Sequence, residues 1–278
     1  MPELPEVETI RRDLEKEFAG RKIKKVDVSG QRSIRRHRDP AEFVDRLEGR
    51  KLAGTVRRGK YLLVRLDNRD VLVVHLGMSG QLLLANPKEA RPKHTHVVVS
   101  FSGAGELRFV DPRTFGEMFV TAAGELDNAL PELAHLGFDP LEDQMTWTQF
   151  GRMLIERHTK LKALLMDQRF VAGIGNMYAD EILFAAGLRP DRGSDTLTAQ
   201  EIRRLYRSMI ETLTEAIKHR GSSLADEQYR DLFGDVGAFQ RLHNVYDREG
   251  EACPRCRCAV VRVRGGGRSS FFCPQCQV

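Results

Sequence analysis

The sequence predicts an α+β fold in two domains, an N-terminal antiparallel β-sandwich with a flanking helix and a helical C-terminal domain that ends in a β-hairpin. Short apolar or alternating runs follow one another from residue 22 to 121, and apolar residues at helical spacing dominate beyond residue 146. All five cysteines fall in the last 26 residues. We expect a sandwich domain over 1–130, a linker over 131–145, a helical domain over 146–248 and a cysteine-bearing finger over 249–278.

The chain starts with a predicted amphipathic helix of about fourteen residues. Pro5 stands where the first turn would lie, a position that favours proline. The apolar residues that then recur at helical spacing are Val7, Ile10, Leu14 and Phe18. This helix should anchor the N-terminus.

Eight strands are predicted after this helix, because short apolar runs alternate with turn signals such as Asp67-Asn68. The runs are 23–28, 51–56, 61–66, 71–76, 81–84, 97–101, 107–110 and 117–120. Their number and spacing favour a mostly antiparallel sandwich. The Gly-x-Gly sequence at 103–105 is interpreted as a hairpin tip and not as a phosphate-binding loop.

Helices are predicted beyond the proline-containing linker. Thr146 with Gln149, and Thr198 with Glu201, have the spacing of capping boxes. One face of the second helix carries Ile202, Leu205, Met209, Leu213 and Ile217. Gly221 should end that helix.

The cysteines predict one structural zinc ion. Cys253 and Cys256 form one C-x2-C knuckle, and Cys273 and Cys276 form another, sixteen residues further on. Two such knuckles are typical of a four-thiolate tetrahedral site, which leaves no open position for catalysis. Cys258 could compete with Cys256, but Cys256 keeps the two-residue spacing and is our choice. The strands between the knuckles, 259–264 and 269–272, should form a hairpin.

The charge distribution favours a polyanionic partner. The net charge is +5 and the isoelectric point is about 9.0. Ten Lys or Arg residues stand against four acids between Gly30 and Lys60, and five Arg against one acid between 251 and 278. Such runs suit a phosphate backbone, although a solvated charged surface is an alternative. No segment is apolar enough to span a membrane and the first twenty residues are too charged for a secretory signal, so we expect a cytosolic protein.

The first residues suggest a nucleophile. Removal of Met1 would turn Pro2 into a free secondary amine, and an α-amino group titrates near pH 8, so part of it is uncharged at neutral pH. Such an amine can attack a carbonyl-level carbon and form a covalent iminium. Glu3 lies beside it as a candidate proton donor. Alternatively, Pro2 and Pro5 only lead into the first helix.

A glycine-containing turn at 171–181 lies between two helical patterns. Backbone amides at the start of a helix bind phosphate well, so the turn is a candidate phosphate site that ends at Asn176. A purely structural turn is the alternative.

Eight stretches in the same order resemble the family of formamidopyrimidine-DNA glycosylases, bacterial enzymes that repair 8-oxoguanine. They are 2–8, 59–62, 75–80, 111–116, 165–168, 173–181, 245–246 and the cysteine finger. The resemblance covers nearly the full length. It implies a β-sandwich, a helix-two-turn-helix module and a zinc finger, with duplex DNA containing oxidised bases or abasic sites bound between the two lobes. It also implies a monomer that works on the bacterial nucleoid.

The resemblance also implies roles for single residues. Pro2 would attack C1′ of the damaged nucleotide, Glu3 would act on the sugar ring, and Lys60, beside Arg57 and Arg58, would hold a phosphate. The family's intercalating trio matches Met78, Arg113 and Phe115, and its phosphate clamps match Asn176 and Arg268. We group Pro2, Glu3, Lys60 and Arg268 as catalytic, and His75, Met78, Arg113, Phe115, Lys162 and Asn176 as DNA-binding. The loop that closes over the flipped base matches 222–240.

Two alternatives to this function remain. The related endonuclease VIII type removes oxidised pyrimidines, but its start usually has Gly where this chain has Leu4, and it generally lacks the trio. A catalytically silent zinc-finger DNA-binding protein would not need Pro2, Glu3 and Lys60. The chain also departs from the family at two positions, with Thr114 where Arg is frequent and Asp247 where Gly is usual.

Overall fold

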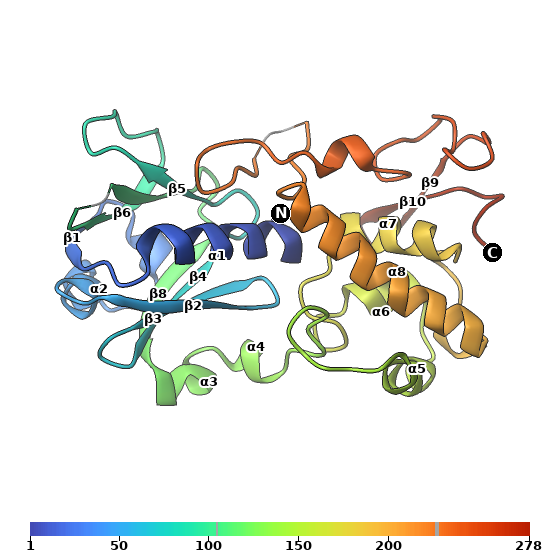
Figure 1. Ribbon diagram of the computed structural model, residues 1–278, viewed down its shortest axis with the longest axis horizontal. Coiled ribbons are helices and arrows are strands. Elements are labelled where there is room, and N and C mark those ends of the chain that lie inside the picture. The colour runs from blue at the N-terminus through green and yellow to red at the C-terminus, as the bar shows by residue number, and fades with distance from the viewer. Residues whose placement is uncertain (104, 226–227) are drawn as a thin grey trace. The chain divides into compact units, whose positions relative to one another are not determined.

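The structure, a computed structural model, describes residues 1–103, 105–225 and 228–278 (Figure 1). The chain divides into two compact units. The first comprises Met1–Ala134 and His219–Gln240, and the second comprises His135–Lys218 and Arg241–Val278. The division after Ala134 falls inside the 131–145 segment that the sequence marks as a linker.

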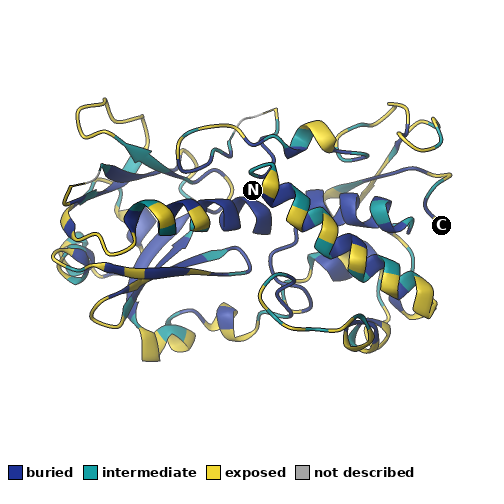
Figure 2. Ribbon diagram, in the orientation of Figure 1, coloured by how far each residue is buried: buried dark blue, intermediate teal, exposed yellow. Residues whose placement is uncertain are grey.

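Helix α1 (Leu4–Phe18) opens the first unit, as predicted. Glu3 is its N-cap and forms a capping box with Glu6, and a proline lies in its first turn. All seven residues from Leu4 to Ile10 are buried, whereas the later turns alternate between buried and exposed positions (Figure 2). The start of the chain is therefore fixed inside the protein.

The β-sandwich has two four-stranded antiparallel sheets. One has the order β1 (Ile23–Val28), β6 (Thr95–Phe101), β7 (Glu106–Val110), β5 (Gln81–Ala85), and the other β2 (Leu52–Arg58), β3 (Tyr61–Leu66), β4 (Asp70–His75), β8 (Glu117–Ala122). All eight predicted strands are present, with ends shifted by two residues at most. Within the predicted hairpin tip at 103–105, Ala104 lies outside the described residues.

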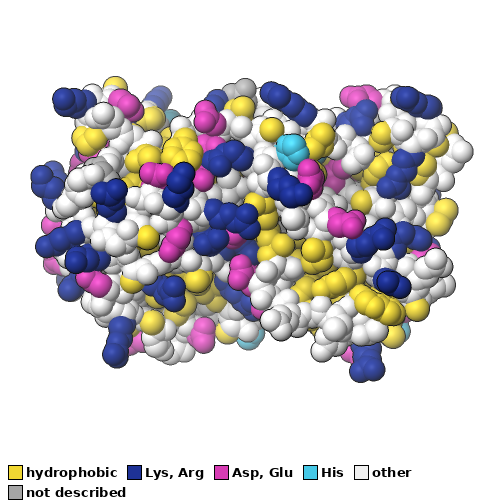
Figure 3. Space-filling model, in the orientation of Figure 1, with side chains coloured by type: hydrophobic (Ala, Val, Ile, Leu, Met, Phe, Trp, Pro, Cys, Tyr) yellow, Lys and Arg dark blue, Asp and Glu magenta, His cyan; other side chains and the backbone are white. Residues whose placement is uncertain are grey.

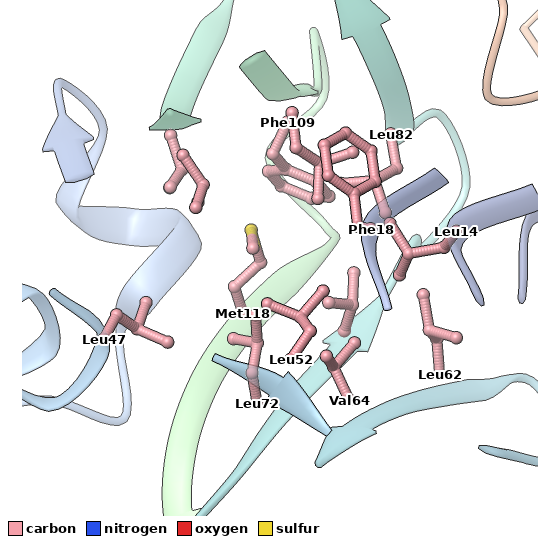
Figure 4. Packing of buried hydrophobic residues seen from close by; sticks show 14 of the residues in the cluster. Leu14, Phe18, Leu47, Leu52, Leu62, Val64, Leu72, Leu82, Phe109 and Met118 are labelled. Atoms are coloured by element: carbon pink, nitrogen blue, oxygen red, sulfur yellow. The ribbon is translucent and has the colours of Figure 1, made fainter. Parts of the chain in front are cut away.

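The core of the first unit lies between the sheets and α1 (Figure 4). The rings of Phe18 and Phe101 lie 4.3 Å apart. Tyr229 and Leu232, from the 219–240 segment, are part of the same core, and Leu84 N donates to Leu232 O at 2.7 Å. This packing explains why 219–240 belongs to the first unit, whereas the sequence assigned it to the helical domain by chain order alone.

Helix α2 (Pro40–Leu47) was not predicted. The Asp39 side chain caps it by accepting a hydrogen bond from Glu42 N at 3.0 Å, and Pro40 occupies the first turn. Phe43 and Leu47 are buried. The Asp-Pro pair is the start signal that the sequence offered for this helix.

Short helices complete the first unit and its exit: η1 (Gln31–Ile34), η2 (Ala123–Glu125), α3 (Leu126–Ala129) and α4 (Pro131–Ala134). The second unit contains α5 (Trp147–Ile155), α6 (Leu161–Met166), α7 (Asn176–Ala186), η3 (Ser194–Thr196), α8 (Ala199–Lys218), η4 (Phe239–Leu242, which starts in the first unit), β9 (Val261–Gly265) and β10 (Arg268–Phe272). Both predicted capping boxes are formed, at Thr146 with Gln149 and at Thr198 with Glu201. The predicted hairpin is the antiparallel pair β9–β10.

Candidate active site and DNA-binding residues

The buried start of the chain is held by Glu6. Its Oε2 accepts a hydrogen bond from Glu3 N at 2.9 Å, and its Oε1 accepts one from Ser222 N at 2.8 Å. Pro2 and Glu3 are buried, whereas Met1 is exposed. One carboxylate thus joins the candidate nucleophile and acid to the first residues of the 222–240 loop. Asp226 and Glu227 of that loop lie outside the described residues.

Lys60 lies in the two-residue turn between β2 and β3, where Arg58 pairs with Tyr61. The turn needs Gly59, whose φ is +56°. Lys60 is 8% exposed. Arg57 binds the carboxylate of Glu8 on α1 through Nε at 3.2 Å and donates to Gly59 O at 3.2 Å. The sequence suggested that Arg57 supports phosphate binding, but its buried guanidinium connects the Lys60 turn to α1.

The candidate intercalating residues Met78, Arg113 and Phe115, called the wedge below, come from two loops. Met78 lies after β4, and Arg113 and Phe115 lie between β7 and β8. Met78 is 37% exposed and Phe115 47%, as expected for residues at loop tips. The Arg113 guanidinium lies 5.3 Å from the centre of the Phe115 ring. These exposed apolar side chains have the character of residues that enter a base stack.

Asp111, fully buried, holds these two loops together. Its Oδ1 accepts hydrogen bonds from Ser79 Oγ at 2.6 Å and from Arg113 N at 3.2 Å. Its Oδ2 accepts one from Gly116 N at 2.7 Å. A Cβ on Gly77 would lie 2.5 Å from Gly116 N, so the loops are in close backbone contact. The wedge residues are therefore fixed relative to one another.

Two residues near the wedge have a strained backbone conformation, and a third positive φ accounts for the departure from the family at Asp247. Thr114, a β-branched residue, has φ +55°, and exposed His94, whose carbonyl accepts from Asp111 N, has φ +66°. Strained residues cluster at functional sites, so His94 is a candidate that the sequence analysis missed. At Asp247 φ is +59°. This left-handed position is one that glycine adopts without cost and Asp tolerates.

His75 ends β4, with its ring 4.8 Å from that of Tyr61. Burial lowers the pKa of His75 more than the opposing charge of Glu117 raises it, and Lys60 lowers it further. The imidazole is therefore neutral at pH 7 and can offer a phosphate an N–H donor but no positive charge.

In the second unit, Asn176 is the first residue of α7, after a loop held by Gln168. The Gln168 side chain accepts from Gly173 N at 2.8 Å and donates to Ile174 O at 2.7 Å. Within the described residues, the buried Oδ1 of Asn176 has no hydrogen-bond partner. Helix starts are natural anion sites, so this turn keeps its predicted character as a candidate phosphate clamp.

Lys162 and Arg268 have different surroundings. Lys162 is buried, and its ammonium donates to Asp180 Oδ2 at 3.0 Å and to Ser269 O at 2.7 Å. Arg268 is exposed at the start of β10, directly after a two-residue turn of positive-φ glycines. Only Arg268 of the two therefore presents its charge at the surface.

The four predicted zinc ligands converge. The Sγ atoms of Cys253, Cys256, Cys273 and Cys276 all lie within 4.8 Å of one another. A tetrahedral zinc with Zn–S bonds near 2.3 Å needs S–S distances of about 3.8 Å, and two of the Sγ pairs lie at 3.4 and 3.9 Å. Cys258 lies outside this group and donates to Gln275 Oε1 at 2.7 Å. The residues fit one zinc ion, with Cys256 and not Cys258 as ligand.

Charge alone does not mark a binding surface on the face of the protein that Figure 3 shows. On the face shown in Figure 3, Lys and Arg side chains are interspersed with Asp and Glu. Within 1–103, 105–225 and 228–278, no helix has the length and apolar character needed to cross a membrane.

Comparisons with known proteins agree with this arrangement. The model of the formamidopyrimidine-DNA glycosylase N-terminal domain matches residues 1–118, that of the glycosylase H2TH domain matches 136–228, and that of the zinc finger found in FPG and IleRS matches 250–278. The formamidopyrimidine-DNA glycosylase of Pelotomaculum thermopropionicum is 42% identical over 277 residues, which is 100% of this chain and 99% of the relative.

Two solved structures are also similar. The crystal structure of MutM (Fpg) from Thermus thermophilus has a TM-score of 0.87 and 43% identity, over 99% of this chain and 98% of that one. Lactococcus lactis Fpg bound to DNA with an abasic site has a TM-score of 0.90 and 33% identity, over 99% of both chains. The same relative has been crystallised with DNA containing N7-benzyl-Fapy-dG and with DNA containing an oxidised pyrimidine.

A β-sandwich, an H2TH domain and a zinc finger in this order define the class, a zinc-finger DNA glycosylase of base excision repair. The family resemblance seen in the sequence is confirmed: this chain belongs to the formamidopyrimidine-DNA glycosylase family.

Proposed function

We propose that this protein removes oxidised purines, 8-oxoguanine and formamidopyrimidines, from duplex DNA and then cleaves the strand at the resulting abasic site. The observation that carries the proposal is the end-to-end match to the family, combined with Pro2 and Glu3 at the capped, buried start of α1. Its substrate is bacterial chromosomal DNA, so the protein works at the nucleoid.

The chemistry requires that Met1 is removed first. The Pro2 nitrogen then forms a bond to C1′ of the damaged nucleotide as the bond from C1′ to the base breaks, and the base leaves with the electron pair and takes up a proton. Glu3 protonates the ring oxygen, which opens the sugar and leaves an iminium between Pro2 and C1′. The iminium acidifies the C2′ protons, so successive eliminations expel the 3′ and then the 5′ phosphate.

DNA binding uses both units in this proposal. Met78, Arg113 and Phe115 enter the space left by the extruded base, and extrusion itself costs a few kcal/mol, least for a weakened pair. Lys60, Asn176 and Arg268 hold phosphates beside the lesion, with His75 as a neutral donor, and the 222–240 loop closes over the flipped base. Zinc stabilises the fold of the finger and takes no part in bond cleavage.

Matched duplexes that differ only in the lesion test the substrate class. We expect single-turnover excision to be faster for 8-oxoguanine than for thymine glycol, because the chain carries the purine-type trio. Faster excision of thymine glycol would favour the endonuclease VIII type. A duplex with a natural abasic site tests the silent-binding alternative, which predicts binding without strand cleavage.

A further inference from the structure

Two buried, oppositely charged side chains hold the hairpin that carries Arg268. Asp180 Oδ2 accepts hydrogen bonds from the Lys162 ammonium and from Phe271 N, each at 3.0 Å. The other carboxylate oxygen, Oδ1, lies 2.9 Å from the same ammonium. The ammonium also donates to Ser269 O at 2.7 Å. The pair therefore binds the β10 backbone at two points, one and three residues after Arg268.

The rest of the finger is attached elsewhere. Arg255 donates to Phe184 O on α7 at 2.9 Å, and Gln277 Nε2 donates to Leu188 O at 2.8 Å. These bonds secure the two cysteine knuckles. Within the described residues, Lys162 and Asp180 are the ion pair whose side chains bond to the backbone of β10, the strand that starts at Arg268.

One member of the pair lies in the same helix as the other candidate phosphate clamp. Asp180 lies four residues after Asn176 in α7, so both side chains are on one face of that helix. Lys162 lies in α6 and is 6% exposed, and Asp180 is 1% exposed. The Lys162 ammonium is held by the Asp180 carboxylate and by Ser269 O, so it is directed to these partners and not to a phosphate.

We propose that Lys162 and Asp180 are positioning residues that set Arg268 at the phosphate it holds, and that Lys162 itself does not contact DNA. The inference rests on the proposed function, in which Arg268 is a phosphate clamp. It changes the role that the sequence resemblance implied for Lys162.

Burying this ion pair costs desolvation free energy, so we infer that the pair is kept for a functional role and not only for stability. Burial raises the pKa of Asp180 to about 7, although the Lys162 charge opposes this shift. Buried ion pairs are seldom better for stability than apolar residues of similar size, so they are weak evidence for stabilisation.

The central test is Asp180→Asn, measured as affinity for a duplex with an uncleavable abasic-site analogue at several salt concentrations. The change removes whatever negative charge Asp180 carries and adds none, so electrostatics alone would not weaken binding. We expect instead about a tenfold loss of affinity and a salt slope smaller by about one, as for one lost phosphate contact. Asp195→Asn, in η3 of the same unit and with an exposed side chain, is the matched control and should bind at least as tightly as wild type.

A double-mutant cycle separates positioning from general damage. In an Arg268→Ala background, adding either Lys162→Met or Asp180→Asn should lower the affinity for the duplex by less than about a further twofold. The residue that the pair positions is already absent from this background. Lys162→Arg should keep most of the affinity. Additive losses, or a wild-type salt slope in Asp180→Asn, would overturn the inference.

Zinc content and melting temperature are measured for each variant. If a single variant loses zinc, the neutral pair Lys162→Met with Asp180→Asn replaces it, since it leaves no unpaired buried charge, and the same loss of affinity is expected. Strand cleavage by wild type monitors the proposed function separately. An inactive wild type contradicts the function, whereas an active wild type with a normal Asp180→Asn variant contradicts only this inference.

Discussion

Three buried carboxylates, Glu6, Asp111 and Asp180, each accept hydrogen bonds from separate segments of the chain. Glu6 joins the N-terminus to the 222–240 loop, Asp111 joins the wedge loops, and Asp180 joins α7 to β10. None of these three contacts was predicted from the sequence. In the sequence, each of these acids stands next to apolar residues, which suggests burial. A buried acid must be paired, so such a position predicts a hydrogen-bonded carboxylate.

Asp180 gives a prediction for stability against pH. Its pKa is about 7 in the folded protein and about 3.8 unfolded, so between these values the folded state holds a proton that the unfolded state releases. Stability from this group therefore falls as pH rises through the window, by about 2 kcal/mol between pH 5.5 and 7. Urea titrations at pH 5.5 and pH 7 measure the unfolding free energies of wild type and Asp180→Asn. The value for wild type minus that for the variant should be lower at pH 7 than at pH 5.5 by this amount. A constant difference would show that the carboxyl does not titrate there.

Glu3→Gln tests the proton donor. An amide can still accept the capping hydrogen bond, so the fold of α1 and the affinity for an uncleavable abasic duplex should stay within about twofold of wild type. Loss of the acid should lower the single-turnover rate of strand cleavage on an 8-oxoguanine duplex by about 10² to 10⁴, because the sugar must open before the phosphates are eliminated. A rate within about threefold of wild type would exclude Glu3 as the acid.

At the scale of elements, the strands could be predicted because each alternates or forms a short apolar run between turn signals. Helix α2 was overlooked, although Asp39-Pro40 signalled its start. The loop contacts could not be predicted, because Gly77 and Gly116 are far apart in sequence and their approach depends on the packing of both sheets. Met78 and Phe115 are exposed, which agrees with their match to the family's intercalating trio.

A pair of glycines tests the wedge contact. Gly77 and Gly20 both have positive φ, +63° and +76°, so alanine strains the backbone at each by about 1 kcal/mol. At Gly20 a Cβ would meet nothing within 4 Å, whereas at Gly77 it would meet the backbone of 115–116. Gly77→Ala should therefore cost about 1 to 3 kcal/mol more than Gly20→Ala in urea unfolding. Equal costs would mean that the loops can separate freely.

At the scale of the whole molecule, the segment His219–Gln240 packs in the first unit although it follows the helices of the second unit in the sequence. The chain leaves the second unit after α8, contributes Tyr229 and Leu232 to the sandwich core, and returns to the second unit for the finger. No local pattern reveals this, because the apolar residues of 219–240 are sparse and their partners lie more than a hundred residues earlier. The finger was predictable in detail, since ligand spacing alone defines it.

Zinc content tests the ligand assignment. Cys256→Ser should reduce bound zinc well below one per chain and weaken DNA binding, because the metal organises the finger that carries Arg268. Cys258→Ser should keep one zinc, since its Sγ lies outside the cluster. Metal analysis of both purified variants decides this, and a zinc-free Cys258→Ser protein would exchange the two roles.

The most direct test of the account is to trap the covalent intermediate. Wild-type protein is incubated with an 8-oxoguanine duplex and borohydride, and the adduct is analysed by intact mass and peptide mapping. We predict a chain that lacks Met1 and carries the reduced deoxyribose on the Pro2 nitrogen. Attachment at Lys60 or another lysine, or full activity of a chain that retains Met1, would contradict it.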